Sequence, residues 1–357
     1  MPNYVISIDK AQTIDGKNIV DETKFVFDLE YAGSVVSSSS KTIIAECDGF
    51  ITTTGRIVYL KDLFFSGHPG SVKTSYTELL CMGGRADGGR LNEIEKVRFE
   101  DSATVQHTHV LSQANHYLAG TSSGREAVAA GGSGDADRIQ KVRFDDTVAA
   151  YQFTNTLSSD KRGVAGAASF GDAIFGGGVS LVSSIDKVSY DDSAFTILSN
   201  TLSTGTEYLA AASTRTEIVF VGGVTSTGQS AKAEKLRYDD SAMGLMTNGL
   251  SIARARHAGS GTVSEMMFSG SVTTGNNAST EKLRYDDTVA SVALTDLPNG
   301  RNSLCAESNI LDRCLFLGGS PGPQDTMQAM HFDDSAQTVY TSTLSQPKFA
   351  TASAAGY

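Results

Sequence analysis

Paired acidic residues return six times in this chain of 357 residues, in the phrases KVRFEDS, KVRFDDT, KVSYDDS, KLRYDDS, KLRYDDT and AMHFDDS. Two adjacent carboxylates could bind Ca²⁺ or share general acid–base work. Catalysis needs one such site, however, whereas a structural turn is needed in every repeat. Asp, Ser and Thr side chains bond nearby backbone groups in turns. We therefore interpret the six pairs as turn scaffolding.

Three histidines are the other residues whose spacing could support chemistry. His107 and His109 are two apart on an expected strand and so share a face, and His116 follows. Three histidines can ligate a metal, but no carboxylate stands at ligand spacing, so we interpret them as exposed strand and loop residues. The chain has no phosphate-binding loop, no G-x-S-x-G and no H-E-x-x-H. The sequence therefore predicts a protein that is not an enzyme and has neither cofactor nor metal.

The spacing of the acidic turns indicates the elements that carry them. Their second members lie 45 to 48 residues apart, at Asp101, Asp146, Asp192, Asp240, Asp287 and Asp334. An apolar run that ends in a small or Gly pair precedes each turn, as in LLCMGG at Gly84, and an Ala/Gly-rich run follows each. Four short strands in about 47 residues make one propeller blade. Six such units predict six blades.

Each strand of the unit has an expected place. The Ala/Gly-rich run suits the innermost strand, because large side chains would collide near the axis. The Gly pair after the second strand lets a neighbouring backbone approach closely. The aromatic residue of the third strand is expected to pack between blades. These aromatics are Phe99, Phe144, Tyr190, Tyr238, Tyr285 and Phe332.

The Gly pair, the aromatic-Asp step and the spacing resemble the kelch repeat over roughly residues 75–357. One departure is clear, since the kelch motif usually has Trp on its fourth strand and this chain has none. The matching positions are Gln106, Tyr151, Ile197, Leu245, Val292 and Val339. Five of the six are apolar or aromatic, so we expect them to keep the packing role.

The ring is expected to close through the end of the chain. The last Ala/Gly-rich run, PKFATASAAGY, is not followed by the second strand of another repeat. In the first repeat, the second strand, near Thr77–Gly84, has no inner strand before it. The C-terminal strand therefore completes the first blade, which removes an open sheet edge. The predicted fold is an all-β, six-bladed kelch-like propeller.

Residues 1–74 lack the repeat but are β-rich, with the runs YVISI, KFVFDL, KTIIAE and GRIVYL. We predict two domains, a 1–74 attachment segment and a 75–357 propeller. A degenerate seventh blade is the alternative for the first, because Arg56–Tyr59 loosely echoes a third strand.

Charge and composition narrow the possible partners. The formal net charge of −11 offers no basic surface for nucleic acid. The first residues lack a signal-peptide pattern, and no apolar run approaches the ~20 residues that span a bilayer, so we expect no membrane insertion. Of four cysteines, Cys81, Cys305 and Cys314 lie in apolar runs. Buried free thiols are expected there, with a Cys305–Cys314 disulfide as the alternative.

Variable polar loops follow the Gly pairs and share a propeller face with the connectors between blades. Binding residues usually lie on such loops carried by a rigid frame. The candidate binding residues are Arg85, Asp87, Asp135, Arg138, Thr225, Thr227, Gln229, Asn276, Asn277 and Asp325.

Short Gly/Ser/Thr-rich kelch-like units without Trp look like the propellers of tailed bacteriophages. That resemblance implies a virion protein of a fibre, tail or capsid-associated kind, within a homo- or hetero-oligomeric assembly. It would contact other virion proteins through residues 1–74 and a host surface glycan or protein through the loop face. The alternative is a cytoplasmic kelch adaptor that recruits a protein partner, but residues 1–74 show no convincing amphipathic helix.

Overall fold

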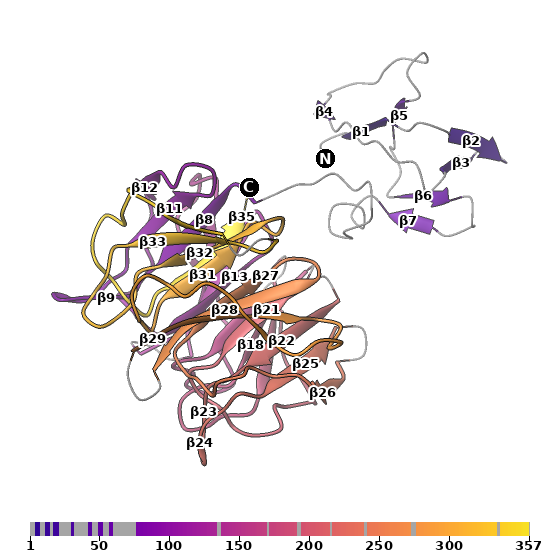
Figure 1. The fold of residues 1–357 in the computed structure, drawn as a ribbon. Coiled ribbons are helices and arrows are strands. Elements are labelled where there is room, and N and C mark those ends of the chain that lie inside the picture. The colour runs from indigo at the N-terminus through magenta and orange to yellow at the C-terminus, as the bar shows by residue number, and fades with distance from the viewer. Residues whose placement is uncertain are drawn as a thin grey trace. The chain divides into compact units, whose positions relative to one another are not determined.

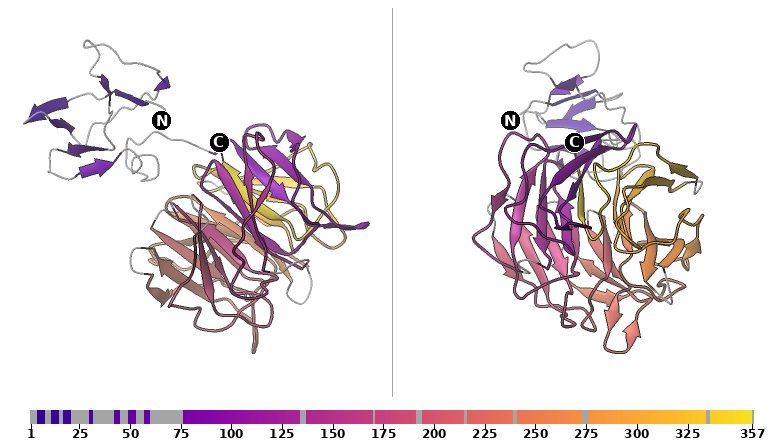
Figure 2. Two further views of the ribbon diagram at one scale, coloured as in Figure 1. Left: turned by 180° about the vertical axis from the view of Figure 1, so that it is seen from behind. Right: turned by 90° about the vertical axis from the view of Figure 1, so that its left-hand side faces the viewer.

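The computed structural model describes residues 76–133, 137–169, 171–190, 194–214, 216–238, 241–272, 276–333 and 336–356, together with seven short strands among the first 59 residues. The chain divides into two units, Met1–Thr74 and Ser75–Tyr357. The second unit is a six-bladed β-propeller (Figures 1 and 2). Among the described residues no helix is long and apolar enough to span a bilayer.

The first unit contains two sheets. One has the order β4-β1-β5, from Glu30–Tyr31, Tyr4–Ser7 and Thr42–Ile44. The other has the order β2-β3-β6-β7, from Ala11–Ile14, Lys17–Val20, Gly49–Thr52 and Ile57–Tyr59. The β3–β6 pair is parallel, whereas every strand pair described in the blades is antiparallel, so this sheet is not a seventh blade of the same kind. The run KFVFDL lies outside the described residues.

The six blades each have four antiparallel strands. In order from the inner to the outer strand, blade 1 is β35 (Ala352–Gly356), β8 (Glu78–Met82), β11 (Ile94–Arg98) and β12 (Thr104–Gln106); blade 2 is β13 (Leu118–Ser122), β14 (Glu126–Gly131), β15 (Ile139–Arg143) and β16 (Tyr151–Gln152); blade 3 is β17 (Ala165–Ala168), β18 (Asp172–Gly176), β19 (Ile185–Ser189) and β20 (Phe195–Ile197). Blade 4 is β21 (Ala210–Ser213), β22 (Glu217–Val221), β25 (Ala233–Arg237) and β26 (Met243–Leu245); blade 5 is β27 (Ala258–Gly261), β28 (Glu265–Val272), β29 (Asn276–Arg284) and β30 (Val292–Ala293); blade 6 is β31 (Cys305–Ser308), β32 (Arg313–Leu317), β33 (Met327–His331) and β34 (Gln337–Val339). Two hairpins, β9 (Arg85–Ala86) with β10 (Gly89–Arg90) and β23 (Val224–Thr225) with β24 (Gly228–Gln229), extend from blades 1 and 4.

The C-terminal strand closes the ring, as the sequence predicts. β35 pairs with β8, with Ala354 opposite Leu80 in the register. Figure 1 shows this yellow strand beside the purple β8. Ala354 and Leu80 are fully buried in the core between blades 1 and 2. The first blade therefore depends on both ends of the propeller sequence.

The third-strand aromatics pack between neighbouring blades, which confirms that expectation. Phe144 of blade 2 lies in one cluster with Leu80 and Ala354 of blade 1. Two of the three phenol oxygens find partners, as buried hydroxyl groups usually do, whereas the Tyr285 hydroxyl is buried without one among the described residues. Tyr190 OH lies 3.0 Å from the Thr121 hydroxyl, and Tyr238 OH donates to the Ala168 carbonyl at 2.8 Å.

The fourth-strand positions expected to replace Trp do not pack, so that prediction was wrong. Tyr151 is 54% exposed and Leu245 62%, and Gln106, Ile197, Val292 and Val339 are exposed as well. The packing residue lies one or two positions further along, as with the buried Phe153 and Met246. The outer strand is an edge of only two or three residues, and the packing residue follows its end, as Phe153 follows β16 and Met246 follows β26.

The Gly pairs allow the close backbone approach that the sequence predicts. In blade 2, Gly131 and Gly132 have φ of +75° and +103°, which L side chains rarely adopt. A Cβ on Gly131 would lie 2.2 Å from the Lys161 carbonyl oxygen. The Gly132 amide donates to that same oxygen at 3.0 Å. The Gly pair thus ties each blade to the connector that leads into the next.

A lysine of the third strand makes another tie between blades in blades 1, 2, 4 and 5. In blades 2, 4 and 5 its ammonium donates to a backbone carbonyl of the next blade at 2.8 Å, as Lys141 does to Tyr190. Blade 6 has Ala329 at this position. There Arg313 of the neighbouring strand reaches the Phe99 carbonyl of blade 1 at 3.5 Å. The last junction therefore keeps the tie with a different residue.

The three described cysteines are free and buried, as expected. Cys314 stands opposite Ser308 in the register and Cys305 opposite Leu317, so the alternative Cys305–Cys314 disulfide is not present. Instead, the Cys305 sulfur lies 3.9 Å from the Cys81 sulfur across the junction of blades 6 and 1. Cys47 lies outside the described residues.

Candidate binding site at one end of the propeller axis

Six connector residues, one entering each blade, form a closed ring of backbone hydrogen bonds. Each amide donates to the carbonyl of the equivalent residue of the preceding blade, at 2.6 to 3.0 Å. All six have positive φ, between 52° and 66°. Left-handed backbone costs a non-glycine residue roughly 1–2 kcal/mol, so its presence in every blade shows that the ring imposes it. The residues are Tyr117, Gly163, Tyr208, Arg256, Ser303 and Ala350.

The ring lies at the end of the propeller that carries the variable loops. Bridges join those loops to the connectors, as between Arg85 and Phe349, Glu207 and Val224, and Asn302 and Ser320. The loops after the Gly pairs and the connectors therefore share one face, as the sequence analysis expected. Residues near the ring can act together with residues of these loops.

Side chains at the ring break the symmetry of its backbone. Tyr117 and Tyr208 meet edge to face, with centroids 5.4 Å apart. The guanidinium carbon of Arg256 lies 4.5 Å from the Tyr208 centroid and 5.6 Å from that of Tyr117. Arg162, one residue before the ring, lies 5.9 Å from both centroids. Blades 6 and 1 contribute only Ser303 and Ala350.

Gly163 makes room for this arrangement. A Cβ at Gly163 would lie 2.6 Å from the Cδ1 atom of Tyr208, closer than real contacts allow. The Tyr208 ring can therefore lie against the backbone of blade 3, where it is 8% exposed.

His116 adds a buried imidazole. It is 6% exposed, and its ring centroid lies 4.8 Å from that of Tyr117. Burial, together with Arg90, Arg85 and Arg162, lowers the pKa of His116 to about 4. These arginines make the local potential positive although the whole chain is acidic. We name His116, Tyr117, Arg162, Tyr208 and Arg256 the axial cluster.

The cations of the axial cluster differ from Lys161 and Arg254, which lie two residues before the ring residues Gly163 and Arg256 of the same connectors. Arg254 is fully buried and bonds Glu281 and the Ser279 carbonyl. Lys161 is likewise buried against Asp186, at 3.2 Å. No ion pair joins Arg162 or Arg256 to a carboxylate among the described residues. His116, Arg162 and Glu207 each lie one residue before a ring residue, and Glu207 is half-buried.

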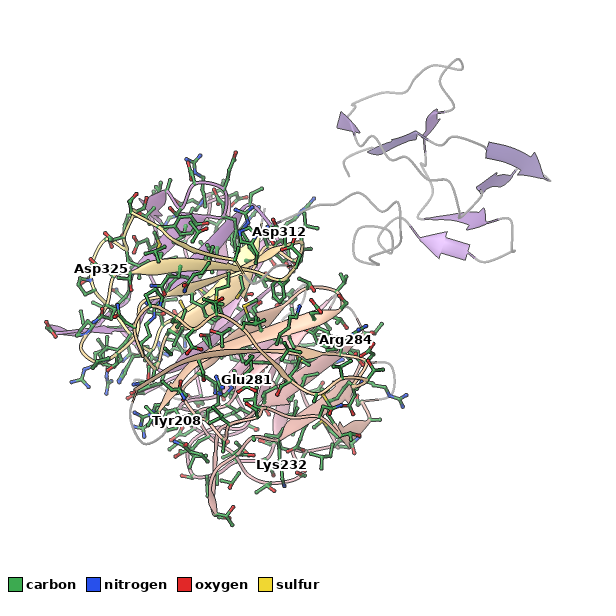
Figure 3. All side chains as sticks on the ribbon, in the orientation of Figure 1. Tyr208, Lys232, Glu281, Arg284, Asp312 and Asp325 are labelled. Atoms are coloured by element: carbon green, nitrogen blue, oxygen red, sulfur yellow. The ribbon has the colours of Figure 1, made fainter. Side chains whose placement is uncertain are left out.

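Most candidate residues predicted from the sequence lie in loops around the rim rather than at the axis. Arg85 is the exception, since its charge acts on His116. Asp87 is exposed between β9 and β10, and Asp325 lies in the blade 6 loop (Figure 3). Arg138 donates to Gln152 at 2.8 Å. Asp135 lies outside the described residues, as does the side chain of Asn276.

Four more predicted residues bond within the loops, three of them in their own loop and Gln229 across to the next blade. The Thr225 hydroxyl lies 3.1 Å from that of Thr227 and donates to the Gly228 carbonyl at 3.0 Å. Asn277 accepts from the Ser279 amide at 2.7 Å. Gln229 donates across to the Val272 carbonyl of blade 5. These four residues are uncharged, in contrast to Asp87, Arg138 and Asp325 in the other loops of the rim.

Sequence reasoning missed the axial cluster. Its signal lies in the connectors, where the small residues expected near the axis give way to His-Tyr, Arg-Gly, Glu-Tyr and Ala-Arg in blades 2 to 5. Only the ring shows that these positions converge.

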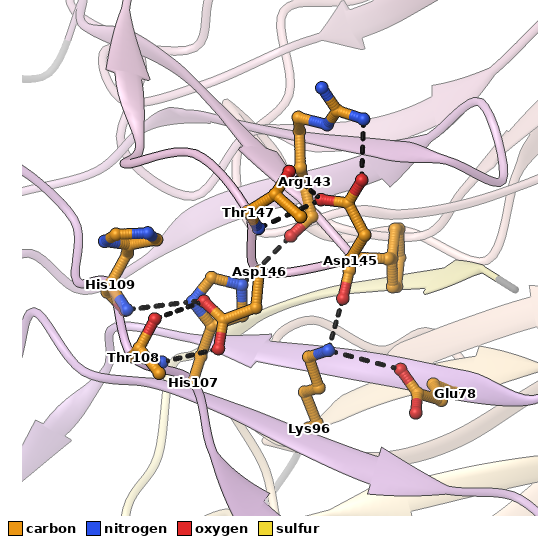
Figure 4. A network of polar contacts seen from close by, with 10 residues as sticks. Glu78, Lys96, His107, Thr108, His109, Arg143, Asp145, Asp146 and Thr147 are labelled. Carbon is orange, nitrogen blue, oxygen red and sulfur yellow. Dashed lines mark hydrogen bonds and ion pairs between the residues drawn. The ribbon is translucent and has the colours of Figure 1, made fainter.

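His107 was predicted to be exposed, and that prediction was wrong. Its side chain is buried, with Nδ1 2.8 Å from Asp146 and Nε2 3.0 Å from the Arg143 carbonyl oxygen (Figure 4). It follows β12 at the position where blade 2 has Phe153. His116 is buried as well. No group of three His, Cys, Asp or Glu side chains in the described part of the chain is placed to hold a metal.

The acidic pairs of blades 1, 2 and 5 act as turn scaffolding, as interpreted from the sequence, whereas Asp191, Asp192, Asp239, Asp240 and Asp334 lie outside the described residues. Asp145 accepts from the Thr147 amide and hydroxyl within its own turn. Asp146 instead accepts from the Thr108 amide and hydroxyl in blade 1 (Figure 4). Burial opposes its ionisation, but these hydrogen bonds and His107 outweigh it and lower the pKa of Asp146. In blade 2 one carboxylate thus shapes the turn and the other joins neighbouring blades, and Asp286 and Asp287 divide the roles in the same way in blade 5. In blade 1, Asp101 instead accepts from the Ala103 amide of its own turn.

Comparison with known protein families finds no family model that matches this chain, and comparison with curated proteins finds no match either. The site must therefore be interpreted from its own geometry.

Proposed function

We propose that this chain is a non-enzymatic structural and binding protein whose propeller presents its axial loop end to a partner. The observation that carries the proposal is the contrast between two sets of polar residues. Those that recur from blade to blade are used within the fold, as Lys141, Asp146 and Arg254 illustrate. Those of the axial cluster occur once each and pair with no carboxylate of the described chain. Groups that the frame does not use are available to a ligand.

We further propose that the protein is a bacteriophage virion component, of a fibre, tail or capsid-associated kind. This part is supported by the kelch-like repeats that are rich in Gly, Ser and Thr and lack Trp. Residues 1–74 would join the propeller to other virion proteins, and the axial end would face a further virion protein or a host surface glycan. A rigid six-bladed frame suits that use, because it holds a binding face without rearrangement.

Mass spectrometry of purified particles from the source, after lysine crosslinking, tests this function. We expect the chain in the particle fraction, with crosslinks from Lys10, Lys17 or Lys41 to another virion protein. Absence of the chain from every particle fraction, together with a monomeric purified protein, would overturn the virion proposal.

A further inference from the structure

We infer that the axial cluster binds the carboxylate of an acidic saccharide. The inference rests on the proposed function as a binding module and names the ligand class of its axial end. It starts from two guanidinium groups that face the same pair of aromatic rings.

The two guanidiniums are the groups that would hold the carboxylate. Arg256 and Arg162 lie within 4.5 to 5.9 Å of the Tyr117 and Tyr208 centroids. A guanidinium presents a rigid fork of donors that matches a carboxylate in bidentate geometry. Stacking on aromatic rings restricts both side chains before a ligand arrives, which lowers the ordering cost of binding.

Two buried polar atoms of the cluster have no partner that the chain supplies. These are Nδ1 of His116 and Nε of Arg162; Nε of the frame arginines Arg254 and Arg301 is also unpartnered among the described residues, so the observation counts only together with the two stacked guanidiniums. Buried polar atoms are nearly always paired with protein, water or ligand. Oxygen atoms of a carboxylate or of neighbouring hydroxyls would provide the missing partners.

The surroundings favour a saccharide over an acidic peptide. Loops at the same end carry uncharged side chains, on Thr225, Thr227, Gln229 and Asn277, that bond within the fold and keep lone pairs or amide hydrogens for sugar hydroxyls. Arg162 and Arg256 place two cations together at the axis, whereas Arg138 and Lys232 lie singly in the surrounding loops, and the chain as a whole carries −11. An extended polyanion would be repelled by that total charge, whereas one carboxylate experiences mainly the local positive potential. The half-buried Tyr117 offers an aromatic surface to a sugar ring.

Calorimetric titration of the full chain tests the inference. The probes are the methyl glycosides of N-acetylneuraminic acid and of glucuronic acid, with methyl glucoside as the neutral probe and triglutamate as the peptide probe. We expect binding of at least one acidic glycoside and none of methyl glucoside. Arg256→Gln and Arg162→Gln should each weaken binding at least about tenfold, as expected for loss of a charge-assisted bidentate contact.

Lys232→Gln provides the matched control. It removes the same charge from an exposed side chain in the blade 4 loop (Figure 3), and it should change the affinity less than about twofold, since exposed charges are well screened. Melting temperatures show whether each variant folds. If Arg256→Gln does not fold, Arg162→Gln still tests the inference, because Arg162 is not one of the six ring residues.

Three results would overturn the inference. These are no binding of either acidic glycoside at about 10 mM, the weak limit for a specific contact, affinities unchanged in both arginine variants, and binding of triglutamate as tight as that of the glycosides. None of them would remove the chain from virion particles, so the inference and the proposed function can fail separately.

Discussion

Arg256 and Tyr208 are joined twice, once through the backbone and once through the side chains. The Arg256 amide donates to the Tyr208 carbonyl at 2.9 Å, and the Arg256 guanidinium carbon lies 4.5 Å from the Tyr208 ring centroid. The first contact belongs to the ring that all six blades share. The cation–π contact joins two ring residues at this junction only, among the six junctions between blades. The fold and the candidate site therefore meet in the same two residues but depend on different atoms.

Two arginines of one connector should differ sharply in their effect on stability. Arg254→Gln leaves buried Glu281 without its cation, and such a loss typically costs about 3–5 kcal/mol. Arg256→Gln keeps the backbone ring and loses a partly exposed cation–π contact worth about 0.5–1 kcal/mol. Urea unfolding of the two variants gives the comparison. Equal losses of unfolding free energy would contradict the division between frame and site.

Deletion of residues 347–357 should unfold or aggregate the propeller. It removes β35 from β8 and leaves Glu95 without Lys348, whose Nζ lies 2.9 Å from it in a fully buried pair. Losses of about 2–5 kcal/mol per buried residue together rival a total stability of about 5–15 kcal/mol. The exposed Thr341→Ala substitution is the control. A deletion variant with the wild-type melting temperature would show that the last strand does not close the ring.

Stability should fall as the pH rises from about 4.5 to about 7 because of Glu307. Burial raises the pKa of Glu307 to about 7, against hydrogen bonds from Ser260 and the Ser308 amide. The folded state thus favours the protonated acid, and this contribution is lost once the group ionises. The free energy of unfolding of Glu307→Gln should therefore rise relative to that of the wild type as the pH rises. The expected difference above pH 7 is roughly 1–2 kcal/mol, since partial exposure screens the charge. A difference between the two proteins that stays constant from pH 4.5 to 8 would contradict this assignment.

His257 should make the free energy of unfolding rise with pH, in the range below about pH 6.5. Burial, with Arg254 nearby, lowers the pKa of His257 to about 3. The folded state favours the neutral imidazole, so its contribution is present above about pH 6.5 and is lost as the pH falls toward 3. His257→Gln should flatten the acid limb of a plot of unfolding free energy against pH. An unchanged acid limb would show that other groups govern acid unfolding.

Cys81 and Cys305 should form a disulfide when the protein is treated with diamide. Their sulfurs are 3.9 Å apart, and the hydrogen bond between them lowers the pKa of the Cys81 thiol to about 7. The azo group accepts the two electrons and two protons that the thiols release. The bond would link blade 1 to blade 6 and stabilise the ring by a few kcal/mol, about the value for a long closed loop. Peptide mapping and melting temperature measure both effects, and Cys305→Ser is the control; diamide treatment without a crosslink would contradict the expected approach of the sulfurs.

The frame could be predicted from the sequence because each of its contacts occurs six times. The Gly pair at Gly131, the aromatic Phe144 and the C-terminal run of alanines each signal a backbone requirement that repeats at a fixed spacing. Closure of the ring could be predicted because the first repeat lacks an inner strand of its own. The packing residue near each outer strand was not predicted correctly. In blade 2, for example, Tyr151 and Phe153 are both aromatic, and the sequence does not show which of them faces the core.

The axial cluster could not be predicted in the same way. Its members depart from the repeat, so alignment of the units makes them look like variation in a small-residue run. Tyr117 and Tyr208 are 91 positions apart, and they meet only because left-handed residues of six connectors bond around one axis. The predicted rim residues were found because variable loops are visible in sequence, whereas convergence on the axis is a property of the closed ring.

A crystal structure of the full chain with the methyl glycoside of N-acetylneuraminic acid would test the central claim most directly. We expect the ligand carboxylate within hydrogen-bond distance of Arg256 and Arg162, with its sugar ring over Tyr117 and its hydroxyls toward the loop rim. Ligand bound instead at the outer turns, such as that of Arg284 and Asp286, with the axial cluster unchanged, would contradict the account.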